Sequence, residues 1–252
     1  MLISFVSAKG SPGVTTTALA IGAVWPRRAV VADVDPFGGD VAAGLGRGSW
    51  PAGAGLMELV LDARTMPVEA ALPQRVFRPA AHCPYALAGF GQPGQAGGMP
   101  WREVADAFAR STDVDVLADC GRFTPTDGVV PLLRRSDVLV LVTRSTLPAV
   151  RAAARLAPLL RALGPAEPGD PRLTVLMVAP DRPYSGAEIA GACEAPLLGE
   201  LPYDPRTAAV WSDGSPPGRG LTRTPLQRQA RRAAELLSGT SARPTAVTGG
   251  AR

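Results

Sequence analysis

The sequence is poor in the residues that build disulfide frameworks and zinc sites. It holds 252 residues, with no asparagine, one histidine, one lysine and three cysteines. Cys83, Cys120 and Cys193 lie far apart without a Cys-x-x-Cys pair, and His82 has no second histidine. We therefore expect three small core residues in a reducing, cytoplasmic setting, and a structural role for His82. No Ser-His-Asp or paired-carboxylate arrangement typical of a hydrolase is found.

Long apolar runs are also missing. The first residues, MLISFVSA, have no basic residue before an apolar run of about six residues, which is too short for a signal peptide. No other stretch approaches the roughly 18 apolar residues of a membrane span. We expect a cytoplasmic protein, for which docking at a membrane surface or cell pole stays open. Hydrophobic residues make up 46% of the chain and charged residues 19%, which is typical of a folded protein.

Short apolar runs alternate with helical patterns along the chain. The runs 2–6, 29–34, 114–119, 137–143 and 172–179 are continuous rather than alternating, as in strands covered on both faces. Helices are expected at 15–25, 56–63, 101–110, 128–135, 147–163, 185–193 and 225–237, and a further short strand within 79–100. This order predicts a three-layer α/β fold with a mostly parallel twisted sheet and helices on both faces.

The domain boundary is expected near the last helical pattern. We predict one domain over residues 1–237. The tail 238–252 lacks apolar periodicity and is expected to be disordered.

The one lysine stands in the stretch AKGSPGVTT, between the first strand and the first helix. Main-chain N–H groups of such a loop and helix start can converge on a phosphate, assisted by the helix dipole. Gly10 and Gly13 let the backbone approach, and the hydroxyl of Thr15 can bind magnesium. The alternative is a plain strand–turn–helix, because Val14 occupies the lysine position of the ordinary P-loop pattern.

KGSPGVTT resembles the deviant Walker A motif K-G-G-x-G-K-T-T of the MinD/ParA family of P-loop ATPases. The residues matched to that motif are Lys9, Gly10, Ser11, Gly13, Val14, Thr15 and Thr16. The resemblance implies that Lys9 is the signature lysine, which reaches across a homodimer interface to the partner's nucleotide. Valine in place of the second lysine is similar to the CpaE/TadZ branch, which is associated with pilus assembly and polar positioning.

Later segments match the same family in order. VVADVDPFGGD resembles switch I, which implies that Asp35 orients the attacking water and that Asp33 lies near the magnesium. VDVLADCGR resembles the Walker B and switch II region, where Asp119 would hold magnesium through water and Gly121 would let the backbone pivot. Segment 199–204 matches a late family motif. The asparagine that helps the family to read adenine is replaced by segment 178–185.

The resemblance implies an ATP- and magnesium-dependent dimerising switch that positions or assists assembly of a pilus or secretion apparatus. Hydrolysis is expected to be slow, because one of two phosphate-facing lysines is missing. Two alternatives stay open: a non-hydrolysing pseudo-ATPase scaffold, and a ParA-like partition protein that binds DNA non-specifically. The basic helix at 225–237 fits packing, a DNA contact, or a membrane or partner contact.

Overall fold

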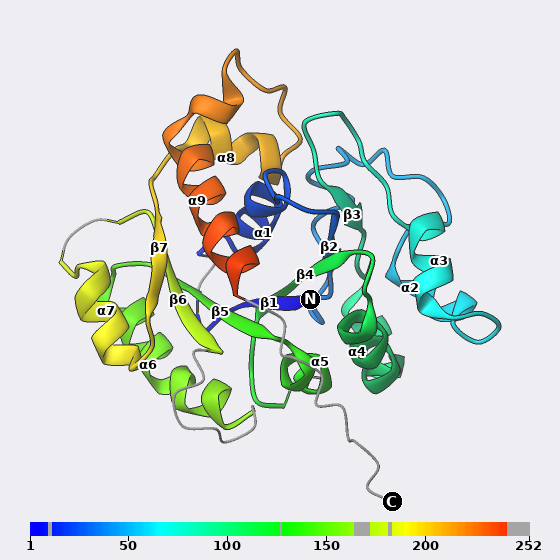
Figure 1. The fold of residues 1–252 in the computed structure, drawn as a ribbon, viewed down its shortest axis with the longest axis horizontal. Coiled ribbons are helices and arrows are strands. Elements are labelled where there is room, and N and C mark those ends of the chain that lie inside the picture. The colour runs from blue at the N-terminus through cyan, green and yellow to red at the C-terminus, as the bar shows by residue number, and fades with distance from the viewer. Residues whose placement is uncertain (10–11, 127, 164–171, 181–182, 241–252) are drawn as a thin grey trace, which may run out of the picture.

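Seven strands form one sheet in the order β3-β2-β4-β1-β5-β6-β7, and every pairing between them is parallel (Figure 1). The structure is a computed structural model that describes residues 1–9, 12–126, 128–163, 172–180 and 183–240. The strands are β1 (Leu2–Ser7), β2 (Ala29–Asp33), β3 (Tyr85–Leu87), β4 (Asp115–Arg122), β5 (Val138–Thr143), β6 (Leu173–Val178) and β7 (Leu197–Leu201). A sheet buried on both faces explains why the strands read as continuous apolar runs.

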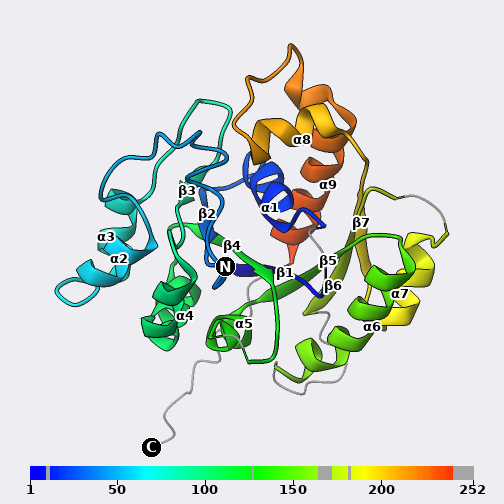
Figure 2. The same ribbon diagram turned by 180° about the vertical axis from the view of Figure 1, so that it is seen from behind.

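Helices cover both faces of the sheet (Figures 1 and 2). One face carries α1 (Val14–Gly22), α8 (Pro205–Ser212) and α9 (Pro225–Gly239). The other carries α2 (Leu56–Asp62), α3 (Val68–Arg75), α4 (Trp101–Arg110), α5 (Val130–Arg135), α6 (Leu147–Ala162) and α7 (Gly186–Cys193). Short 3₁₀ turns span Pro93–Gly98 and Leu221–Arg223. The predicted three-layer α/β fold is therefore confirmed.

The predicted strands are confirmed within about two residues, except that β4 runs three residues beyond its predicted end, to Arg122. Among the α-helices and strands, α3, α8 and β7 were not predicted. The first helix also ends earlier than expected, at Gly22 rather than Trp25. There the chain tightens into a 3₁₀-type turn, and the Trp25 indole N–H donates to Asp115 at 2.8 Å. This bond draws Trp25 toward β4 and out of the helix line.

The last helix ends slightly later than predicted. Helix α9 continues through Ser238 and Gly239, two residues beyond the predicted helix at 225–237. The carbonyl of Ser238 accepts a hydrogen bond from Arg27 at 2.9 Å, which ties the last turn to the body of the protein. The rest of the predicted tail, 241–252, lies outside the described residues.

All three cysteines are buried and free, as expected for core residues. The imidazole of His82 lies 6.2 Å from the Trp211 ring, in keeping with a structural role. None of the helices in the described ranges is both long and apolar enough to cross a bilayer.

The position of β1 decides where a ligand can bind. β1 lies at the centre of the sheet, between β4 and β5, and the chain leaves it toward β2 on the far side of β4. In open parallel sheets, ligands bind beyond the carboxyl ends of the strands where the order reverses. That point is the loop after β1, which contains Lys9.

Candidate functional site

The loop after β1 leads into α1 through Gly13. Gly13 has a φ of +92°, a left-handed conformation that glycine adopts without strain, and it is the N-cap of α1. No side chain caps this end of the helix. The first N–H groups of an α-helix have no acceptor within the helix, so these donors suit an anion. Gly10 and Ser11 lie outside the described residues.

The first three residues of α1 differ in what they expose. Val14 is 6% exposed and belongs to the apolar cluster beneath α1, so its side chain is part of the core. Thr15 and Thr16 are half-buried. Val14 can therefore offer only its main-chain N–H to a ligand, whereas the threonines can also offer hydroxyl groups.

Two buried carboxylates lie beside this helix start, on adjacent strands. Asp33 ends β2 and is paired in register with Asp119 of β4, and each is 1% exposed. The Thr15 hydroxyl lies close enough to the Asp119 carboxylate to lower its pKa. The Gly121 N–H donates to Asp119 Oδ1 at 3.0 Å, while Asp119 Oδ2 is buried without a hydrogen-bond partner. The structure thus joins three residues that were assigned to magnesium from sequence.

Asp35 lies against the backbone that follows Asp119. Gly121 has a φ of +59°, and a Cβ atom placed on it would lie 1.8 Å from Asp35 Oδ2. Asp35 Oδ1 accepts a hydrogen bond from the Phe37 N–H at 2.9 Å. The segments that resemble switch I and switch II are therefore in direct contact through Asp35 and Gly121.

Burial, together with the charges of neighbouring carboxylates, raises the pKa values of the two inner carboxyls. Burial is the main cause of the raised pKa of Asp33, and the charge of Asp119 adds to it. Burial likewise raises the pKa of Asp119 to about 6, although the Thr15 hydroxyl and the hydrogen bond from Gly121 lower it. Nearby cations favour the charged form of a carboxyl, so a cation beside Asp119 would reverse the shift.

A magnesium ion fits this arrangement in a particular way. No group of three or more His, Cys, Asp or Glu side chains in the described part of the chain could hold a metal ion by itself. Mg²⁺ is usually bound by one or two carboxylates together with waters and substrate phosphates. The unpartnered Asp119 Oδ2 and the adjacent Thr15 hydroxyl are oxygen ligands of that kind.

Lys9 is exposed just after β1. It takes part in none of the ion pairs found among the described residues. Lys9 can therefore approach a group outside its own chain.

The structure also shows an exposed cation–π contact that was not predicted. The Arg122 guanidinium lies 5.6 Å from the centre of the Phe37 ring, and Phe37 is 50% exposed.

A small cavity of about 130 Å³ adjoins the start of α1. Its lining includes Pro12, Gly13 and Thr16, together with Ala179 after β6 and Tyr203 after β7. Segment 178–185 stands where the family has the asparagine that helps to read adenine, and segment 199–204 matches a late family motif. Described residues of both segments line this cavity. Asp204, also in its lining, is occupied as the cap of α8, accepting from the Thr207 N–H at 3.1 Å and hydroxyl at 2.7 Å.

Solved structures share this whole arrangement of strands and helices. The cell division ATPase MinD from Pyrococcus furiosus is 20% identical, with a TM-score of 0.74 over 95% of this chain and 99% of that one. A ParA family ATPase from Chlorobium tepidum is 18% identical, with a TM-score of 0.71 over 93% and 98%. The chain has the MinD/ParA fold.

A third structure with the MinD/ParA fold is the septum site-determining protein MinD from Pyrococcus horikoshii, complexed with Mg-ADP. It is 16% identical, with a TM-score of 0.72 over 94% of this chain and 96% of that one. No protein-family model and no curated protein matches the chain. The shared feature is therefore the MinD/ParA fold.

Sequence reasoning missed two glycines that shape the site. A Cβ on Gly39 would lie 2.4 Å from Asp33 Oδ2, and one on Gly89 would lie 2.8 Å from the same carboxyl group. Both glycines therefore let main chain close over Asp33. Gly39 lies within the quoted switch I stretch and could have been singled out, whereas Gly89 follows β3 and carried no signal.

Proposed function

We propose that this protein is a MinD/ParA-like switch that binds ATP with magnesium, dimerises and turns ATP over slowly. Its site would be Lys9 to Thr16 for the phosphates, Thr15, Asp33 and Asp119 for magnesium, and Asp35 for the attacking water. The observation that carries the proposal is the buried Asp119 Oδ2 without a partner, beside the Thr15 hydroxyl at an uncapped helix start. The Mg-ADP in the structure from Pyrococcus horikoshii supports the choice of ligand.

When bound, Mg²⁺ would supply positive charge that stabilises the phosphate oxygens during transfer. The protein's own contribution is position. The uncapped start of α1 would direct N–H groups toward the phosphates, and Thr15 and Asp119 would hold the cation. Asp35, held by the Phe37 N–H, would accept a hydrogen bond from the attacking water.

Nucleotide binding tests the proposal directly. A fluorescent ATP analogue should bind with Mg²⁺ and be released by EDTA. Thr15→Val, which removes the hydroxyl at nearly constant volume, should weaken binding about tenfold or more. Thr112→Val is the matched control, because Thr112 is exposed just before β4, at the end of that strand opposite to Asp119 and Thr15. Absence of binding at millimolar ATP would contradict the proposal.

Lys9 should act on dimerisation and turnover more than on binding by one chain. Lys9→Ala should keep nucleotide affinity within about threefold but remove the ATP-dependent dimer and the slow hydrolysis. Lys9→Arg should recover little, because a planar guanidinium does not replace a compact ammonium in a crowded phosphate site. Light scattering with and without ATP gives the mass, and phosphate release gives the rate. Equal turnover in Lys9→Ala and the natural protein would remove Lys9 from the site.

A pseudo-ATPase scaffold is the second candidate. The buried Val14 side chain favours it, because the ordinary P-loop has at this position a lysine whose ammonium binds the phosphates. Binding without hydrolysis would select this function. A DNA partition role is the third candidate, because Arg231 and other arginines are exposed on α9. DNA binding that depends on ATP and weakens as the salt concentration rises would support it.

The apparatus served by the switch is also part of the proposal. The valine in the loop favours the CpaE/TadZ branch, and with it a pilus or secretion apparatus at a cell pole or membrane. Co-purification with a secretion ATPase, dependent on ATP and on Lys9, would support this assignment. Polar localisation that persists without any such partner would count against it.

A further inference from the structure

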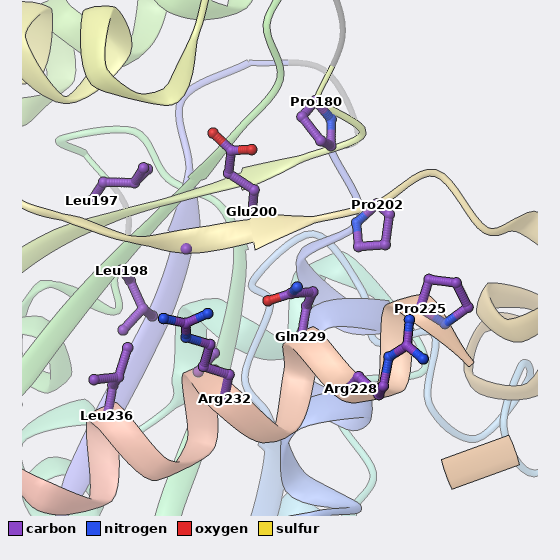
Figure 3. Close-up of a pocket in the computed structure, with 12 residues that line it drawn as sticks. Pro180, Leu197, Leu198, Glu200, Pro202, Pro225, Arg228, Gln229, Arg232 and Leu236 are labelled. Atoms are coloured by element: carbon purple, nitrogen blue, oxygen red, sulfur yellow. The ribbon is translucent and has the colours of Figure 1, made fainter. Parts of the chain in front are cut away.

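A groove runs along the edge of the sheet, between β7 and α9, far along the sheet from the loop after β1. Its volume is about 590 Å³ (Figure 3). β7 is the last strand in the sheet order, so within the described ranges no strand pairs with its outer side. α9 packs against β7 and, in Figure 3, runs beneath it in the opposite direction. The groove therefore has a strand edge on one side and a helix on the other.

The strand edge offers main-chain hydrogen-bonding groups. The Leu201 carbonyl faces β6, where it accepts from the Ala179 N–H at 2.8 Å. Successive residues of a strand direct these groups to opposite sides, so the N–H and C=O of Glu200 face the open edge. Gly199, beside it, has no side chain to cover the main chain. An added strand could pair here as in β-augmentation.

The helix contributes two positive charges and an apolar side chain in a row. Arg228, Arg232 and Leu236 line the groove at intervals of four residues, and Figure 3 shows both arginines on the side of α9 that borders β7. Neither arginine belongs to an ion pair among the described residues. Leu236 is 52% exposed, which leaves apolar surface to be covered.

The spacing of this row matches a strand. Four residues of an α-helix rise about 6 Å, and two residues of a strand rise about 6.6 Å. Alternate side chains of an extended peptide would therefore meet Arg228, Arg232 and Leu236 in turn. The first two would have to be carboxylates and the third apolar.

We infer that this groove binds an extended acidic segment of another protein, which adds to β7 as a further strand. The segment would place carboxylates on Arg228 and Arg232 and an apolar side chain against Leu236. This interaction surface shares only Pro202 with the small cavity beside the loop after β1, and it does not depend on the proposed function.

Charge selects this occupant over two others. The chain's own last residues, 241–252, carry Arg243 and Arg252 and no acidic residue, so they would be repelled by the two arginines. A second copy pairing through β7 would bring only Glu200 as an acid from that strand. An acidic partner segment fits both arginines.

The test uses a fluorescein-labelled peptide, Thr-Glu-Val-Glu-Val-Leu-Thr, and the full chain without nucleotide. Fluorescence anisotropy should show saturable binding, weakened about tenfold or more by the double variant Arg228→Glu/Arg232→Glu. Arg231→Glu is the matched control, because Arg231 is exposed on the same helix but does not line the groove, and it should change affinity less than twofold. Circular dichroism checks that each variant folds.

Three further peptides test the binding mode. A version with lysine in place of both glutamates should not bind. A version N-methylated at alternate residues, on the side that would face β7, should lose about tenfold, whereas methylation on the other side should not. No saturable binding, equal losses in Arg231→Glu, or indifference to N-methylation would overturn the inference. Dimerisation of the chain through β7, or displacement of the peptide by phosphatidylglycerol vesicles, would assign the groove to another occupant and also overturn it.

Discussion

Asp119→Asn should make the ligand-free protein more stable at pH 7.5, by about 3 kcal/mol in the free energy of unfolding. Burial raises the pKa of Asp119 to about 6 in the folded protein, above its ordinary value of 3.8. The folded state therefore favours the protonated form. The stability linked to that proton is fully present below about pH 4 and is lost as the pH rises through about 6.

Asparagine is neutral at every pH, so the gain should shrink toward zero as the pH falls below about 4. Urea unfolding at several pH values measures this difference between Asp119→Asn and the natural protein. Asp113→Asn makes the same charge change at an exposed position before β4 and should have little effect. A destabilised Asp119→Asn at pH 7.5 would show that burial does not dominate the energy of this carboxyl.

The same substitution should remove the stabilisation given by nucleotide and magnesium. A ligand present at 100 times its Kd stabilises a protein by about 2.7 kcal/mol. That increment should appear in the natural protein and be largely absent in Asp119→Asn, because a neutral amide cannot balance the cation. A thermal shift of equal size in both proteins would exclude Asp119 from the magnesium site.

Gly121→Ala should destabilise the protein by about 2–4 kcal/mol and abolish nucleotide binding. Two separate costs contribute. The φ of +59° disfavours any residue with a Cβ, and that atom would lie 1.8 Å from Asp35 Oδ2. The collision should push Asp35 away from the backbone that follows Asp119. Chemical denaturation and the fluorescent ATP analogue report the two effects.

A control of the same chemistry should give the opposite sign. Gly191 lies within α7 and has nothing within 4 Å of an added Cβ, so Gly191→Ala should stabilise by about 0.5–1 kcal/mol. Adding Asp35→Ala to Gly121→Ala should recover the stability lost to the collision, whereas the cost of the positive φ should remain. Strict additivity of the two substitutions would show that Asp35 and Gly121 do not interact.

The fold was largely predictable because most of its strands are recognisable in the sequence as short apolar runs. Six of the seven strands are short apolar runs or lie in predicted segments, and both faces of the sheet are covered, so polar residues do not interrupt them. The exception is β7, an edge strand whose sequence LLGEL contains a glycine and a charge. Helix α3 was missed for a similar reason, since it contains Pro73 and few buried residues.

The residues of the candidate site that could be predicted are those whose side-chain chemistry and place at the end of an element indicate a ligand. Residues whose role depends on tertiary contacts could not be predicted. Asp33, Asp119 and Thr15 end or begin elements in order, and the parallel sheet brings those ends to one edge. The apolar side chain of Val14 favours the core by its type, but its packing in the cluster beneath α1 depends on tertiary contacts. The closure of main chain over Asp33 by Gly89 depends on how β3 pairs with β2, which local pattern does not fix.

The central place of β1 bears on how the protein is made. Leu2 pairs with Val116 and Ile3 with Val138, so the strand synthesised first must wait for two strands synthesised much later. Until β4 and then β5 leave the ribosome, this buried strand lacks the two neighbours with which it pairs, and distant pairings of this kind form slowly. A growing chain of this protein should therefore associate with chaperones until β5 has emerged.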